Sequence, residues 1–183
     1  MRGKSHRCLG KYLVQHYMSD TPERYVKAFL LGCIEPDRNP ATYLKGSIRC
    51  QWLRGHNYRN ARRFMRAISA RLERKETLKL FDYYTLGKLI HYTTDAFTYA
   101  HNDTFPTALS DHREYEAALQ DHFLEYMKQD PKVNPKIAGS VMEAIYSYHR
   151  EYEAQAENIY TDTRFALNAC CCVLAVLLTN PIF

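Results

Sequence analysis

The chain has 183 residues, and its 25 basic and 20 acidic side chains give a formal charge of +5. The chain is therefore not strongly basic, and this mild positive balance indicates only a weak preference for anionic partners. Seven Gly and seven Pro are few, and alternating β-type runs are nearly absent, whereas long stretches have 3.6-residue periodicity. We therefore expect an all-α fold, a multi-helix bundle formed by one domain over residues 1–183.

The cysteines favour a reducing environment. They lie at positions 8, 33, 50 and 170–172, and no CxxC zinc spacing occurs. Three consecutive cysteines make a poor disulfide framework, so we expect reduced, mostly buried thiols. The first six residues are polar and no apolar signal region follows them. These features together favour a cytoplasmic protein.

The first two helices are marked by their start signals. Ser5 is expected to be the N-cap of the first helix. Residues 20–23, Asp-Thr-Pro-Glu, are typical of a helix start with proline in the first turn. We expect the second helix to stop at residues 35–36, Glu-Pro, which places Asp37 in a loop between two prolines. A lone Asp in such a loop is usually a turn residue.

Residues 41–55 are expected to be irregular, and a basic helix is predicted over residues 58–75. A solvated face is the ordinary explanation of such a charge run, and attraction to phosphate groups is the alternative. Another helix is predicted to begin near Leu80 and to continue into residues 91–101. The arginines of the basic helix are Arg59, Arg62, Arg63, Arg66, Arg71 and Arg74.

The second half of the chain is also predicted to be helical. Residues 102–111 are predicted to form a loop, after which His112 starts a helix. A long amphipathic helix is predicted over residues 136–160. Residues 165–178 form the most apolar run, which at 14 residues is shorter than the roughly 20 needed to cross a bilayer. A buried central helix is the expected explanation.

Two histidine–carboxylate pairs have the spacing of metal ligands. His91 and Asp95, like His112 and Glu116, are four residues apart, so each pair projects from one face of a helix. His101 lies between the pairs and is expected at the end of the first helix or just past it. Imidazole nitrogen and carboxylate oxygen are ligands of zinc. Two such pairs bracketing a third histidine predict a metal site.

The remaining histidines are weaker candidates. His149 and Glu153 share the same spacing, but no further histidine lies nearby, so we expect surface residues there. His6 alone is most simply a polar residue near the start of the chain. His16 and His122 are expected to serve as capping or packing residues.

The residues around the central pair resemble a known family. Residues 84–95, Tyr-Thr-Leu-Gly-Lys-Leu-Ile-His-Tyr-Thr-Thr-Asp, are similar to the "LG…LHY..D" helix of the bacterial zinc-dependent phospholipase C family. That family shares its fold and metal chemistry with trinuclear zinc nucleases. His101 follows at the family spacing, and the pair formed by His112 and Glu116 matches a second family motif.

Three upstream features extend the resemblance to residues 5–116. Residues 5–6, Ser-His, resemble an early family motif, and residues 32–37 are similar to its Gly-x-x-x-x-Asp loop. His56 falls where the family has a histidine. The resemblance implies a cluster of two or three Zn²⁺ ions at the base of a cleft. It assigns Asp37, His56, His91 and Asp95 to the first ion, and His101, His112 and Glu116 to the second.

By the same resemblance, His6 holds a third ion that Asp95 bridges to the first, and Asp37 is the candidate general base. Secreted family members also use the amino group of their first residue as a zinc ligand. Here only five residues precede His6, so the first residue is left out of the expected ligands.

The resemblance implies a hydrolase, a zinc-dependent phosphodiesterase of phospholipase C type. Metal-activated water would attack the phosphate of a phospholipid or another phosphodiester, with weak contact to a membrane surface. A nuclease or nucleotide phosphatase of the same fold remains an alternative, supported by the basic helix, and nucleic acid is a partner only there. A non-catalytic helical protein stabilised by metal is a third alternative. No obligate protein partner is expected.

Overall fold

The computed structural model describes residues 1–39, 58–102, 105, 109–136, 138–155 and 157–178. This part of the chain is helical and contains no strand, which confirms the expected all-α class. The helices are α1 (Gly3–Tyr17), α2 (Glu23–Arg38), α3 (Tyr58–Glu73), α4 (Leu80–Ala96), the 3₁₀-helix η2 (Tyr99–His101), α5 (Leu109–Lys128), α6 (Val141–Glu153) and α7 (Ile159–Leu178).

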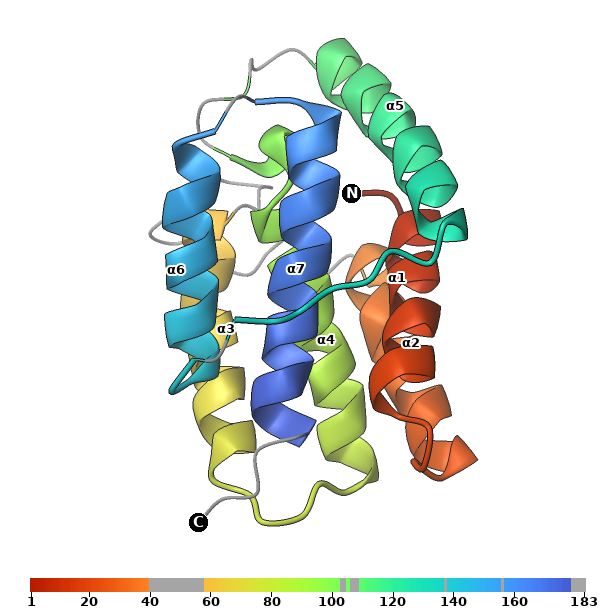
Figure 1. Ribbon diagram of the computed structural model, residues 1–183, viewed down its shortest axis with the longest axis vertical. Helices are drawn as coiled ribbons and strands as arrows, with labels where there is room; N and C mark the ends of the chain where they lie inside the picture. Colours follow the sequence, from red (N-terminus) through yellow and green to blue (C-terminus); the bar gives the residue numbers. More distant parts are fainter. Residues whose placement is uncertain (40–57, 103–104, 106–108, 137, 156, 179–183) are drawn as a thin grey trace.

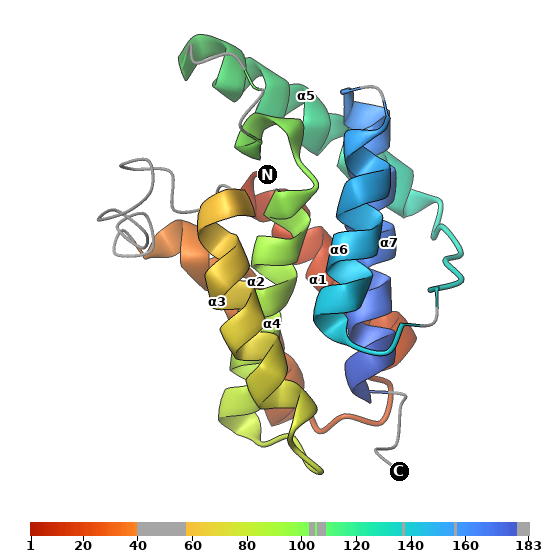
Figure 2. The same ribbon diagram turned by 90° about the vertical axis from the view of Figure 1, so that its left-hand side faces the viewer.

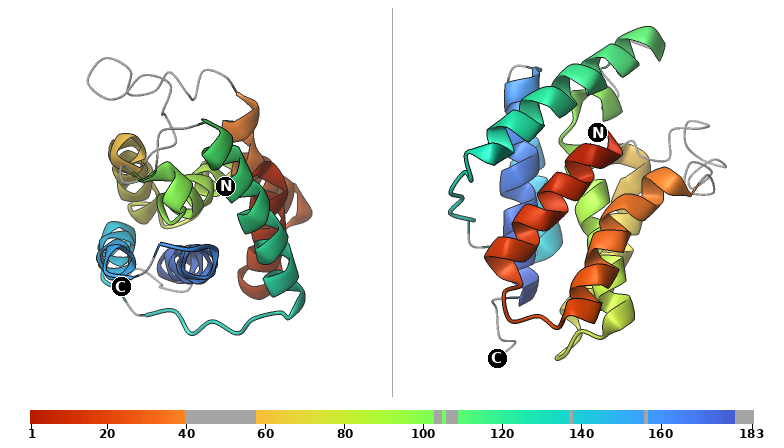
Figure 3. Two further views of the ribbon diagram at one scale, coloured as in Figure 1. Left: turned by 90° about the horizontal axis from the view of Figure 1, so that it is seen from above. Right: turned by 90° about the vertical axis from the view of Figure 1, so that its right-hand side faces the viewer.

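Helix α4 lies at the centre of the bundle. It packs against α2, α3 and α7, while α6 covers α7 and α3 (Figure 1). Helix α5 packs on α1 and α7 and crosses one end of the bundle obliquely, close to the first residue of the chain (Figure 2). The left view in Figure 3 shows the same end from above, where the starts of α1 and α5 lie beside the end of α4.

Helix α7 is the core helix that the apolar run predicts, although it is longer than that run. It has 20 residues because it begins at Ile159, so by length and composition it could cross a membrane. However, 67% of its apolar window is buried inside the bundle. This is the packing of a helix that is hydrophobic nearly all round and is enclosed by its neighbours.

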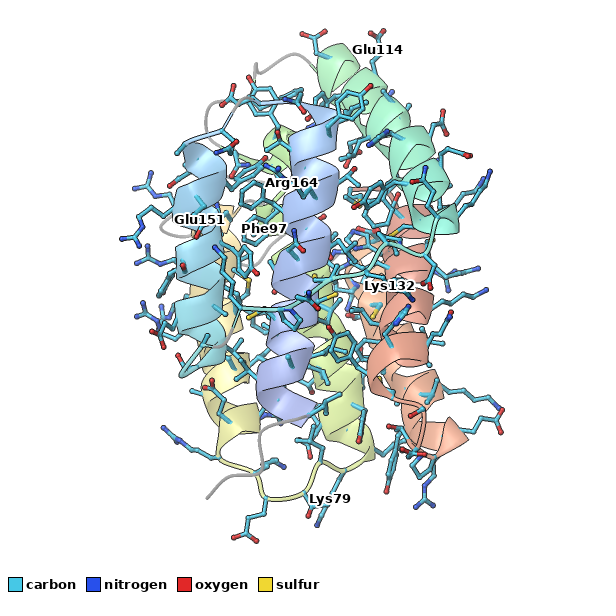
Figure 4. The ribbon with its side chains drawn as sticks, viewed as in Figure 1. Lys79, Phe97, Glu114, Lys132, Glu151 and Arg164 are labelled. Carbon is cyan, nitrogen blue, oxygen red and sulfur yellow. The ribbon has the colours of Figure 1, made fainter. Side chains whose placement is uncertain are left out.

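An aromatic cluster fills the space between α3, α4, α6 and α7. Phe97 is fully buried, lies 5.6 Å from the ring of Tyr152, and points inward in Figure 4, where Glu114 and Glu151 point outward. His149 belongs to this cluster. It is only 4% exposed and stacks on Tyr58 at 3.6 Å, so its prediction as a surface residue was wrong. The aromatic partners, which the i, i+4 pattern does not reveal, account for its burial.

Two predicted boundaries near the start of the chain were also wrong. Helix α1 begins at Gly3 with Arg2 as its N-cap, so Ser5 lies inside the helix. Burial of Met1 fixes the residues before Ser5, which lets the helix start earlier. Helix α2 continues through Pro36, so Asp37 belongs to a helical turn and not to a loop. The turn that contains Pro36 is closed by Asn39 N–H, which donates to the Glu35 carbonyl oxygen at 3.0 Å.

The long helix predicted over residues 136–160 is interrupted. Ser140 caps α6 by accepting a hydrogen bond from Glu143 N–H at 3.2 Å. Asn158 caps α7 by accepting from Tyr160 and Thr161 N–H groups at 3.0 and 2.9 Å. These caps divide a stretch whose apolar periodicity reads as continuous. Helix α5 likewise begins three residues before His112. The irregular segment expected at residues 41–55 lies outside the described residues.

Helices α2 and α4 approach each other at two glycines. A Cβ atom added to Gly87 would clash with the Phe29 carbonyl oxygen and lie 2.8 Å from Cys33 N. A Cβ atom added to Gly32 would clash with the Tyr84 carbonyl oxygen. The two backbones can therefore touch only because both residues lack a side chain. This contact brings the last turn of α2 towards the second half of α4.

We expect Gly87→Ala to lower the free energy of unfolding by about 3 kcal/mol, because rigid backbone groups would have to separate. Gly10→Ala is the matched control. Its added Cβ would lie 3.1 Å from the flexible end of Leu30, and alanine favours the helix, so a change within about 1 kcal/mol is expected. Urea unfolding measures both variants. Equal unfolding midpoints would contradict the close-contact explanation.

Candidate metal centre

The pair formed by His91 and Asp95 lies on the buried face of α4. Both side chains are 0% exposed, and His91 Nε2 lies 3.2 Å from Asp95 Oδ2. His91 Nδ1 lies 3.0 Å from the Cys33 carbonyl oxygen, to which it can donate its hydrogen. This bond orients the ring and leaves Nε2 facing the carboxylate, an arrangement typical of metal-binding histidines.

His6 joins this pair from α1. Its Nε2 atom lies 3.2 Å from Asp95 Oδ1, and its ring stacks on His91 at 3.9 Å. Burial and the nearby His91 lower the pKa of His6 to about 4, so the imidazole is neutral at pH 7. A neutral imidazole is the form that can bind a metal ion. His6, His91 and Asp95 form the first cluster, with one ligand atom from each within 4.8 Å of the others.

The second cluster comprises His101 on η2 and His112 and Glu116 on α5. His101 Nε2 lies 3.2 Å from Glu116 Oε1, and His112 Nε2 lies 3.6 Å from Glu116 Oε2. Their ligand atoms also fall within 4.8 Å of one another. The three side chains are between 13% and 31% exposed, so this cluster is nearer to solvent than the first.

The amino group of Met1 lies between the two clusters. It is fully buried and donates to Asp95 Oδ1 and to His101 Nε2, each at 2.8 Å, while Glu116 Oε1 lies 3.0 Å away. Burial lowers the pKa of this amine, but Asp95 and Glu116 outweigh burial and raise it to about 10. A cation is thus held at the junction of the clusters.

The carboxylates of the site are kept ionised. Burial raises the pKa of Asp95, but the Met1 amine, His101, His91 and His6 outweigh it and hold this pKa well below its usual range. Glu116 behaves likewise, because the Met1 amine and His101 overcome its partial burial and lower its pKa. The site therefore presents anionic oxygens that attract cations.

Asp37 lies at the edge of the first cluster. It occupies the last turn of α2, is 25% exposed, and its Oδ1 atom is 3.6 Å from His91 Nε2. Burial lowers the pKa of His91, but Asp95 and Asp37 outweigh burial and raise it. His91 Nε2 therefore either carries a proton or faces another cation between the two carboxylates.

The structure brings together seven of the eight residues expected as ligands, and the eighth, His56, lies outside the described residues. Their role as metal ligands stays a prediction. Asp95 lies between His6 and His91, which is the position expected of a bridging carboxylate. The Met1 amine, which was left out of the expected ligands because only five residues precede His6, lies at Asp95 and His101. The amino group that secreted family members use was the available signal.

The spacing of the ligand atoms fits a zinc ion. Ligands at about 2.0–2.2 Å from a tetrahedral zinc lie about 3.4 Å from one another. Each imidazole nitrogen lies 3.2–3.6 Å from one oxygen of the carboxylate in its cluster, close to this value, and the two imidazoles of a cluster face different oxygens of that carboxylate. In addition, Nδ1 of His6 is buried without a hydrogen-bond partner among the described residues, so Nε2 is the atom turned towards the cluster.

We expect Asp95→Asn to lower the free energy of unfolding of chelator-treated protein by about 3 kcal/mol at pH 7, because it leaves a buried cation with a weaker partner. The folded-state pKa of Asp95 is lowered, so its contribution is present above the unfolded pKa and is lost as the pH falls below about 4. The difference in the free energy of unfolding between Asp95→Asn and wild type should therefore become smaller below about pH 4.

Asp130→Asn is the matched control, since Asp130 pairs with His16 and Lys132 at the surface, and its unfolding curve should match that of wild type. Denaturant unfolding in the presence of a chelator measures all three proteins. An Asp95→Asn variant as stable as wild type would contradict the charge balance described above.

A family model matches most of the chain. The model of the family described as zinc dependent phospholipase C matches residues 5–159, well over half of the chain. No curated protein and no solved structure matches the chain. The matched region contains α2–α6, α1 from Ser5 onward, and all the side chains of both clusters. The chain belongs to the zinc-dependent phospholipase C family.

Proposed function

We propose that this protein is a phosphodiester hydrolase of phospholipase C type that uses two or three zinc ions and acts on a phospholipid. One observation carries the proposal. Two histidine–carboxylate clusters lie at the same end of the bundle, and His101 Nε2 of the second is 4.0 Å from Asp95 Oδ1 of the first. Neighbouring metal sites suit phosphoryl transfer, in which charge develops on several oxygens at once.

The side chains of the clusters, with His56 as the resemblance implies, would hold the ions. Bound zinc supplies Lewis acidity, which lowers the pKa of water and neutralises phosphoryl oxygens. The buried residues of the first cluster keep rigid positions and exclude bulk solvent, because His6, His91 and Asp95 are at most 1% exposed. The more exposed second cluster provides the side from which a substrate phosphate can approach.

Asp37 is the proposed general base. It is the carboxylate beside the first cluster that remains partly open to solvent, with 25% of its side chain exposed. A carboxylate in this position can accept a proton from water as the water attacks phosphorus. Its place in the last turn of α2, fixed by the contact of α2 with α4, holds it beside His91.

We expect purified wild-type protein to contain two or three zinc ions and to hydrolyse short-chain lecithin, and chelation should abolish the hydrolysis. Asp37→Asn should reduce hydrolysis about 100-fold or more, since a catalytic proton acceptor is lost. Asp121→Asn, on the exposed face of α5, is the control and should retain activity. Zinc is measured by elemental analysis and hydrolysis by phosphate-ester release. Stoichiometric zinc without turnover of any phosphodiester would contradict the enzymatic proposal and favour a structural role for the metal.

A nuclease is the second candidate, favoured by the exposed face of α3. Residues 58–76 contain seven basic and two acidic residues, a difference of +5 that equals the formal charge of the whole chain. The arginines at positions 59, 62, 63, 66, 71 and 74 are all exposed. Charge of this kind attracts phosphate backbones or anionic lipid alike.

Comparing a single-stranded oligonucleotide with short-chain lecithin separates the two candidates. We expect faster turnover of lecithin, and the double variant Arg63→Gln/Arg74→Gln should leave it nearly unchanged because these exposed side chains lie outside both clusters. Faster cleavage of the oligonucleotide, lost in the double variant, would favour the nuclease.

A further inference from the structure

Asp162 is a buried carboxylate in the first turn of the apolar helix α7. It is 0% exposed, and no cationic side chain pairs with it in the described part of the chain. Burial of an ionisable group without compensation is costly. Three hydrogen bonds offset part of this cost, although burial still raises the pKa of Asp162 to about 6. Oδ2 accepts from Tyr99 N–H at 2.9 Å and from the Tyr115 hydroxyl at 2.8 Å, while Oδ1 accepts from the Tyr152 hydroxyl at 2.7 Å.

Two of these three partners lie within two residues of a member of the second cluster. Tyr99 opens the 3₁₀-helix that ends at His101, and Tyr115 directly precedes Glu116 on α5. A shift of either main chain would therefore move a ligand. The third partner, Tyr152, lies on α6, which carries no residue of either cluster. Its hydroxyl also accepts a 3.4 Å hydrogen bond from Nδ2 of Asn102, the residue after His101.

The second cluster lies on two segments outside the central helices, and Asp162 anchors both of them to the core. His101 lies beyond the end of α4 in a helix of three residues, and α5 lies across the end of the bundle (Figure 2). Neither element belongs to the central helices. Asp162, by contrast, is fixed in α7, whose following turns are buried in the core. Its hydrogen bonds connect η2 and α5 to one point of the core.

The first cluster does not use this anchor. His6, on α1, and His91 and Asp95, on α4, make no hydrogen bond or ion pair with Asp162. A change at Asp162 should therefore act on the two clusters unequally.

We propose that Asp162 is a positioning residue for the second cluster, where it holds η2 and α5 so that His101 and Glu116 converge on one ion. The proposal rests on the proposed function in taking this cluster as a metal site. Side chains that orient metal ligands contribute typically 10–100-fold to metal affinity. Asp162 acts through the main chain of the ligand-bearing segments.

Two tyrosine variants form a matched pair. Tyr115→Phe and Tyr152→Phe each remove one hydroxyl that donates to the same carboxylate. Tyr115 directly precedes Glu116, whereas Tyr152 reaches the second cluster only through a long, 3.4 Å hydrogen bond from Asn102, the residue after His101. We expect Tyr115→Phe to weaken the binding of one zinc ion about 10-fold, whereas Tyr152→Phe should change it less than about 2-fold. Competition with a coloured chelator measures the affinity of each ion, and thermal unfolding of the metal-free variants gives their stability.

Variants of Asp162 itself distinguish the effect of its hydrogen bonds from the effect of its negative charge. In Asp162→Asn the amide oxygen can accept from Tyr99 N–H and the Tyr115 hydroxyl, and the amide nitrogen can donate to the Tyr152 oxygen. We expect this variant to retain zinc affinity within about 3-fold, while Asp162→Ala loses about 10-fold at one ion. Cobalt substitution provides a second readout, because the visible spectrum of cobalt reports the geometry of its ligands.

Equal weakening in the two tyrosine variants would overturn the proposal, as would unchanged affinity in Asp162→Ala. The proposal would also be overturned if the variants lost all of their ions in proportion to the fall in their unfolding temperature. A purely structural role of Asp162 predicts that result. Selective weakening in Tyr115→Phe supports the positioning role whether or not the protein hydrolyses any ester. Absence of hydrolysis from a fully zinc-loaded wild type overturns only the proposed function. A wild type that binds no ion at the second cluster overturns both.

Discussion

The buried carboxylate of Asp95 is the constraint on which the rest of the site depends. An ionised group in the interior must be matched by positive charge or by hydrogen bonds, or it becomes neutral. Here the Met1 amine, His6 and His91 all lie within 3.2 Å of its oxygens. The start of the chain, α1 and the centre of α4 therefore meet at one point. This point also lies next to His101, which begins the second cluster.

The helices are arranged so that other candidate ligands reach the same point. The contact between Gly32 and Gly87 allows α2 and α4 to touch, and so the last turn of α2 places Asp37 beside His91. At the other side, α5 crosses the end of the bundle and carries Glu116 to the Met1 amine. The candidate ligands in the described part of the chain come from distant parts of the sequence, but each lies in a helix.

Much of the site could be predicted from the sequence because its strongest signals are local. The spacing of His91 and Asp95, and that of His112 and Glu116, depends only on helix periodicity, and both pairs lie in helices as expected. The same spacing is misleading at His149, which is buried by aromatic neighbours and not exposed. The pattern predicts which residues share a face, but packing decides what that face meets.

The features that were missed depend on contacts between distant segments. The Met1 amine was left out because only five residues precede His6, whereas the fold brings it to Asp95, 94 residues away. Asp162 is an isolated acidic residue near an apolar run, and its three partners come from separate elements. The helix boundaries at Ser5 and Pro36 were misplaced for a related reason, because tertiary contacts overrode local capping and proline signals. His56 remains a prediction from resemblance alone.

The central claim is that these imidazoles and carboxylates share one pocket for divalent ions. Anomalous diffraction at the zinc absorption edge, from crystals of protein purified without chelator, tests it most directly. The account predicts two or three zinc peaks, one within about 2.2 Å of the ligand atoms of His91 and Asp95 and another equally close to those of His101 and Glu116. If protein shown to be exposed to zinc gives a map with no anomalous peak at the first cluster and none at the second, that result would contradict the claim.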